Sequence, residues 1–117
     1  MRITITGKLF NSRVKESSAA TLTAKVWDDS TDTWTAQVPT NAYYRIDNPT
    51  LNTEILGWTS LTAAASMPIV ITGTQNAIVD DSRREERRQV TVKCNSGLST
   101  QYQETADYWI VNLAGQT

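Results

Sequence analysis

The chain of 117 residues has the length of one domain, and its 39% apolar and 20% charged residues are typical of a globular fold rather than a disordered segment. Its formal net charge of −1 argues against nucleic acid as a main partner. No apolar run reaches the length of a membrane span and no signal peptide is evident, so we expect a complete chain that is made in a cytoplasm and has no membrane partner.

The first twenty residues combine an alternating segment, which holds Ile3 and Ile5, with a polar connection of small residues. The ordinary interpretation is a first strand that pairs within its own domain, followed by a loop. The alternative is an arm on a mobile connection, which leaves its domain and adds to the sheet edge of a neighbouring copy. Ile3 and Ile5 are therefore candidate interaction residues.

A period of two continues along the rest of the chain and predicts antiparallel strands with one solvated face. The alternating segments are residues 2–6, 21–26, 33–38, 43–47 and 89–94. Residues 68–72 and 108–113 are apolar on both sides, which suits central or partner-covered strands. We expect Ile46, Trp58, Ile71 and Val92 to face a shared core, with Trp58 placed on the same face as Leu56.

Turn-forming residues separate these segments at residues 28–32, 48–49, 73, 80–82 and 95–97. The spacing predicts seven to nine short strands in an all-β fold, an antiparallel β-sandwich that occupies residues 1–117 as a single domain.

The residues that most enzymes and metal sites use are scarce. Histidine is absent, which removes the commonest general base and zinc ligand. Cys94 is the single cysteine, and its place in an alternating strand predicts a buried thiol. The carboxylates lie in turn-like segments that bring no two together on a strand end. We therefore expect no enzymatic activity, no cofactor and no bound metal.

Two charged segments are candidate interaction loops. The segment from Asp28 to Asp32 offers the oxygen ligands that calcium takes, but it lacks the glycine and the distal glutamate of an EF-hand, so a solvated hairpin turn is favoured. Residues 83–88 hold four arginines and two glutamates, which favours a solvated loop or short turn over a phosphate-binding patch. The candidate interaction residues here are Trp27, Asp28, Asp32, Arg83, Arg84 and Arg87.

The four tryptophans and four tyrosines are many large aromatic residues for this length. Most are expected to fill the core of the sandwich, although Trp27 breaks the alternation after Val26 and is expected to face outward. Exposed aromatic rings anchor protein interfaces and also stack on sugar rings. A carbohydrate-binding β-sandwich module with glycan partners is therefore the alternative function, and it requires tryptophan or tyrosine rings exposed side by side.

Several segments follow one another in a familiar order: Tyr44-Arg45-Ile46-Asp47, Ile55-Leu56-Gly57-Trp58-Thr59, Ile69-Val70-Ile71, Asn76-Ala77-Ile78, and Glu86-Arg87 before Gln89-Val90-Thr91-Val92. This order resembles the small immunoglobulin-like or fibronectin type III-like β-sandwich proteins of tailed-phage virions, and it covers about residues 40–95. The resemblance implies a non-enzymatic virion part: a capsid decoration, a head–tail or neck component, or a tail attachment domain. It also implies a location in the virion, and partners that are other virion proteins or further copies of the chain in a homo-oligomer.

Overall fold

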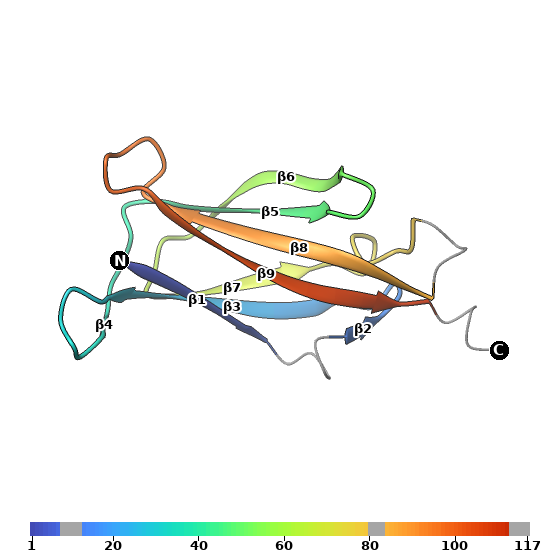
Figure 1. Ribbon diagram of the computed structural model, residues 1–117, viewed down its shortest axis with the longest axis horizontal. Helices are drawn as coiled ribbons and strands as arrows, with labels where there is room; N and C mark the ends of the chain where they lie inside the picture. Colours follow the sequence, from blue (N-terminus) through green and yellow to red (C-terminus); the bar gives the residue numbers. More distant parts are fainter. Residues whose placement is uncertain (8–12, 80–83, 113–117) are drawn as a thin grey trace.

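The computed structural model describes residues 1–7, 13–79 and 84–112, and this part of the chain forms nine β-strands without a helix. The strands are β1 (Arg2–Gly7), β2 (Arg13–Lys15), β3 (Ala20–Asp28), β4 (Thr35–Ala36), β5 (Ala42–Asn48), β6 (Thr53–Leu61), β7 (Ser66–Ile71), β8 (Glu85–Cys94) and β9 (Tyr102–Val111). They form two sheets that face each other as a β-sandwich (Figure 1). The predicted all-β sandwich is confirmed.

One sheet contains β1, β3, β4 and β7, and the other has the order β2-β9-β8-β5-β6. All pairings are antiparallel except that of β2 with β9, which is parallel. The residues from Arg13 to Lys15 were expected in a loop, so β2 is a correction: the chain crosses after β1 from one sheet to the other. β1 itself pairs with β3 of the same chain, as the ordinary interpretation of the first strand predicts.

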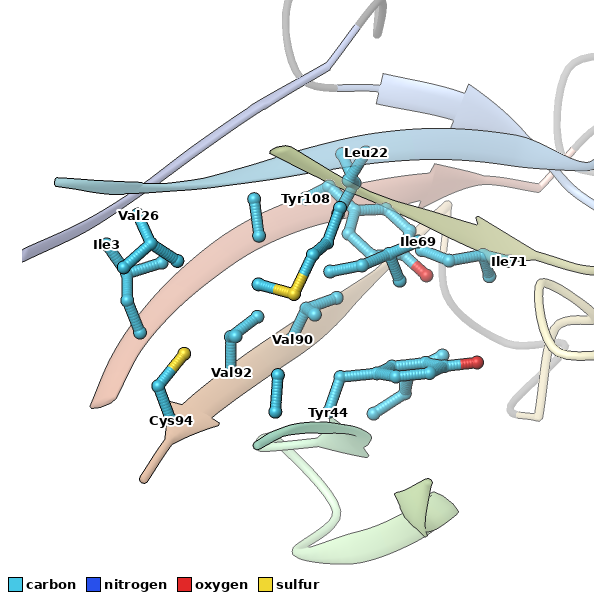
Figure 2. Close-up of a cluster of buried hydrophobic side chains, with 14 of the residues drawn as sticks. Ile3, Leu22, Val26, Tyr44, Ile69, Ile71, Val90, Val92, Cys94 and Tyr108 are labelled. Atoms are coloured by element: carbon cyan, nitrogen blue, oxygen red, sulfur yellow. The ribbon is translucent and has the colours of Figure 1, made fainter. Parts of the chain in front are cut away.

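Side chains from both sheets meet in one apolar core. Figure 2 shows Ile69 and Ile71 of the first sheet facing Val90, Val92 and Tyr44 of the second. Ile71 and Val92 are fully buried, as expected from their alternation, and so is Ile46. Ile3 is buried in the same core, and Ile5 is half-buried against it.

Trp58 was expected in this core, and that prediction is wrong: its side chain is 41% exposed on the outer face. The cause is a β-bulge. Tyr44 pairs with Thr59 but Ile46 pairs with Leu56, so Arg45 alone lies opposite two residues of β6, Gly57 and Trp58. The extra residue breaks the period of two and turns Trp58 to the solvent side.

The predicted strand over residues 33–38 is also largely wrong, because only Thr35 and Ala36 form a strand. β7 pairs with β3 from Ala20 to Lys25, which leaves only Trp27 and Asp28 of that edge for β4. The flanking side chains therefore lie outside the core, and Val38 is 58% exposed.

Three edge strands of the two sheets, β7, β6 and β2, carry features that oppose further pairing, whereas β1, at the other edge of the first sheet, is a regular strand of six residues. β7, which pairs with β3 alone among the described strands, has Pro68 in its middle, and proline offers no N–H to a neighbouring strand. β6, at one end of the five-stranded sheet, is bulged, and β2, at the other end, has only three residues. Such edges disfavour the addition of a strand from another chain.

Candidate interaction surfaces

The outer face of the five-stranded sheet presents an ordered array of polar and aromatic side chains. The pairing of β5, β8 and β9 places three rows across this face: Tyr43, Lys93 and Gln103; Arg45, Thr91 and Thr105; Asp47, Gln89 and Asp107. The bulge in β6 adds Trp58 beside the second row. The inner face of the same strands is committed to the core, so this outer face is the surface that the sheet offers to a partner.

Four of these residues form the Trp58 patch: Tyr43, Arg45, Trp58 and Lys93. The Lys93 ammonium lies 4.0 Å from the centre of the Trp58 ring and 5.6 Å from that of Tyr43, and the Arg45 guanidinium lies 5.5 Å from the Trp58 ring. All three distances are in the range of cation–π attraction.

The two cations of the Trp58 patch differ in how their charge is balanced. Arg45 donates to both carboxylate oxygens of Asp47, at 2.7 and 2.9 Å, and lies 3.5 Å from Glu54. Lys93, by contrast, pairs with no carboxylate within residues 1–7, 13–79 and 84–112. Among the described residues, the contacts of its ammonium group are with the rings of Trp58 and Tyr43.

A second aromatic site on this face surrounds Trp109, which is 39% exposed. Trp109 lies opposite Arg13 of β2 and Arg87 of β8. Arg13 donates to Glu85 at 2.7 Å, and Arg87 pairs with Asp107. The predicted interaction residue Arg87 therefore lies on this face in the middle of a sheet, with its charge already balanced.

The remaining predicted arginines are only partly placed. Arg84 is exposed just before β8. Arg83 lies outside the described residues, as do the predicted turn residues 80–82.

The loop of residues 29–34, which we call the β3–β4 loop, projects at the end of the molecule where the N-terminus also lies (Figure 1). Trp27, expected to face outward, is half-buried, and its indole N–H donates to Thr4 Oγ1 at 3.0 Å. Trp34 is 43% exposed, its ring lies 6.5 Å from that of Trp27, and Arg2 covers it at 4.3 Å. The segment is a solvated turn, as expected.

The three aspartates at this loop have different partners. Asp29 accepts from the N-terminal ammonium at 2.8 Å, and this hydrogen bond is the main cause that lowers the pKa of its carboxyl. Asp28 accepts from the backbone N–H of Ser30, and hydrogen bonds from Ser30 lower its pKa. Asp32 is exposed and forms no ion pair in the part of the chain that the structure describes. It is the carboxylate of this loop most available to a partner.

A buried ion pair lies in the segment that was expected to be a solvated loop, and that expectation is wrong. Glu86 and Arg88 are 2% and 0% exposed, and Arg88 Nη1 lies 2.9 Å from Glu86 Oε1. Both belong to β8 and point to its inner face, in line with Val90. Glu86 also accepts from the N–H of Val79, and Arg88 donates to the carbonyl of Ala77 at 3.0 Å. The pair thus holds the segment that follows β7 against the end of the sandwich.

Asn76 provides a second buried polar link at the same end. It accepts from the Tyr108 hydroxyl at 2.7 Å and donates to the carbonyl of Ser18 at 2.8 Å. Burial raises the pKa of Tyr108 to about 12. These contacts join β9, the segment after β2 and the segment after β7.

Cys94 is fully buried, as predicted, and burial raises the pKa of its thiol, so it is not an activated nucleophile. Within the described ranges, no group of three or more histidine, cysteine, aspartate or glutamate side chains is placed to hold a metal ion. A search of the same residues finds no helix that could span a membrane.

No family model matches this chain, and neither a curated protein nor a solved structure shows significant similarity to it.

Proposed function

We propose that this chain is a non-enzymatic structural and interaction module, and that it serves as an accessory component of a tailed-phage virion. The observation that carries the first part is the placement of tryptophan. Three of the four tryptophans, Trp34, Trp58 and Trp109, have side chains between 39% and 43% exposed. Tryptophan is enriched at the centres of protein interfaces, where it loses its contact with water.

The strand order supports the comparison with immunoglobulin-like modules. In such sandwiches, the strands divide between an ABED sheet and a CFG sheet that can be extended by a further strand next to C. The order β1-β3-β7 corresponds to A, B and E, and β6-β5-β8-β9 corresponds to an extended C, F and G sheet. A domain of this kind, present in many copies on a repeating lattice, would bind its neighbours through sheet faces and loops.

The virion proposal is tested by mass spectrometry of gradient-purified particles from the phage that encodes the chain. We expect its peptides to be enriched in the particle fraction at a constant ratio to the major capsid protein. A chain found only in the soluble fraction of the lysate would refute the virion assignment.

The interaction proposal is tested separately with the purified chain. Sedimentation velocity should show self-association or binding to purified particles, and replacing Trp58 or Trp109 with serine should weaken it. If the wild-type chain stays monomeric at its highest soluble concentration and binds no particles, the interaction proposal fails as well.

One observation favours carbohydrate binding as a second candidate: the rings of Trp27 and Trp34 lie next to each other at the loop end. Arg2 covers Trp34, and Trp27 is half-buried, which leaves limited ring surface for a sugar. A glycan array with the wild type and a Trp34→Ala variant distinguishes the two functions. Binding that is lost in the variant would support the glycan function.

A further inference from the structure

We infer that two copies of this chain bind each other by docking the β3–β4 loop of one copy onto the Trp58 patch of the other, with the Asp32 carboxylate paired to the Lys93 ammonium. This inference rests on the proposed function as an interaction module and assigns its surfaces. Both surfaces are present on every copy, so the same contact can form a closed pair or repeat along an assembly.

Strand addition from a second copy is disfavoured at the outer edges of β7 and β6. Pro68 interrupts the outer edge of β7, and the bulge at Gly57 and Trp58 distorts β6. Copies that do not join at these two edges can associate through side-chain surfaces, which are sheet faces and loops.

The Trp58 patch, made of Tyr43, Arg45, Trp58 and Lys93, offers no carboxylate to Lys93. The ammonium of Lys93 carries three N–H donors and contacts two aromatic rings, neither of which accepts a conventional hydrogen bond. Trp58, 41% exposed beside it, offers an apolar surface to whatever approaches. The patch therefore fits an acidic side chain that is accompanied by an apolar one.

The β3–β4 loop supplies this combination of an acidic and an apolar side chain. Asp29 is occupied by the N-terminal ammonium and by Arg2, but Asp32 is exposed and forms no ion pair within the described segments. Trp34, two residues further on, is 43% exposed. The loop thus presents a carboxylate that forms no ion pair among the described residues, next to the part of the Trp34 residue that Arg2 leaves exposed, and this combination is complementary to the patch in charge and polarity.

The contact must be between copies rather than within one. The β3–β4 loop leaves the sheet that contains β3, whereas the Trp58 patch lies on the outer face of the opposite sheet (Figure 1). The core of the sandwich separates these two surfaces in a single chain. A second copy of the chain can therefore bring its own β3–β4 loop to this patch.

The test exchanges the two charges and measures self-association of the purified full chain by sedimentation equilibrium. Lys93→Glu and Asp32→Lys should each weaken association at least about tenfold, because each places like charges in contact. The double variant with both changes should recover to within about threefold of the wild type, since the charges are again opposite. An equimolar mixture of the two single variants should also associate more strongly than either alone.

Matched controls separate this contact from a general effect of charge. Lys25→Glu reverses an exposed lysine on the outer face of the other sheet and should change association less than about threefold. Far-UV circular dichroism and the melting temperature of each variant should match those of the wild type. Wild-type association should also weaken as the ionic strength rises.

The outcomes are distinguishable. Association that neither single variant weakens, or that the double variant fails to restore, overturns this contact while the module function stands. A loss with Lys93→Glu but not with Asp32→Lys also overturns it and indicates an acidic partner other than this loop. A wild-type chain that neither self-associates nor binds particles refutes both this inference and the proposed function.

Discussion

The buried pair of Glu86 and Arg88 gives the sharpest test of the structure, and replacing Arg88 with methionine is the perturbation of choice. Methionine keeps much of the apolar volume of arginine but removes its charge and its five N–H donors. In the variant, Glu86 would lose the guanidinium at 2.9 Å, and the carbonyl of Ala77 would lose its donor. The segment that follows β7 would lose part of its anchor to β8.

The expected loss follows from burial. Both side chains are at most 2% exposed, so solvent cannot replace the lost partner without the structure opening. Removing one member of a buried ion pair typically costs about 3–5 kcal/mol, because the other charge stays buried without its counter-ion. Against a total stability of about 5–15 kcal/mol for a domain, a loss of this size should lower the midpoint of urea unfolding substantially.

A double-mutant cycle isolates the interaction from the individual losses. We would measure the free energy of unfolding by urea titration, with far-UV circular dichroism as the probe, for Glu86→Gln, Arg88→Met and the double variant. The free energy of unfolding should fall less in the double variant than the sum of the two single losses, by at least about 1 kcal/mol, because the double variant removes both charges of the pair. A loss below about 1 kcal/mol in Arg88→Met, or full additivity, would refute the buried pair.

Three further predictions concern single side chains. The pKa of Tyr108 is raised by burial to about 12, so its proton is held more tightly in the folded state than in the unfolded chain, where the pKa is about 10. The contribution of Tyr108 to the free energy of unfolding should therefore be complete below pH 10 and should fall by about 2–3 kcal/mol as the pH rises to 12. In urea titrations at a series of pH values, Tyr108→Phe should remove this part of the loss of stability at high pH. In the same assay, Trp58→Ala should lower the free energy of unfolding by less than about 1.5 kcal/mol, whereas Ile46→Ala, at a fully buried site, should lower it by about 2–5 kcal/mol. A larger loss for Trp58→Ala than for Ile46→Ala would place Trp58 in the core. Cys94 should react with a thiol reagent only after denaturation, and fast labelling of the native protein would contradict its burial.

The strands themselves were predictable because antiparallel sheets leave a clear record in the sequence. In β3 as far as Val26 and in β5 as far as Ile46, a buried apolar side chain recurs at every second position, as the sequence pattern predicts. In β7, which is apolar on both sides, only the burial alternates. The buried positions of Ile46 and Val92 followed directly from such alternation.

Two errors have the same physical origin, because in both the local sequence was interpreted without knowledge of the pairing partner. Trp58 shares a period of two with Leu56, and only the register of β5 against β6 reveals the bulge between them. Glu86 and Arg88 continue the alternation of Val90 and Val92 toward the start of β8, but their charge favoured a loop. The alternation was the better guide there, since an ion pair can occupy inward positions when each charge has partners.

The candidate surfaces were less predictable than the fold. The sequence pointed to Trp27, Asp28 and Asp32 near the loop end, and the structure places them there. It gave no indication that Lys93 lies between the rings of Tyr43 and Trp58, because these residues come from three different strands. A surface that several strands share depends on register and bulges, which no local pattern encodes.

The parallel pairing of β2 with β9 has a consequence for how the chain reaches this fold during synthesis. β2 ends at Lys15 and its partner residues in β9 are Trp109 to Val111, so nearly the whole chain must be made before this pair can form. At a ribosomal rate of about 5–20 residues per second, β2 waits roughly 5–20 s for its partner. The five-stranded sheet is therefore completed late. Until β9 has been made, the backbone N–H and C=O groups of β2 lack their strand partner, and this exposed edge on the nascent chain is a target for chaperone binding.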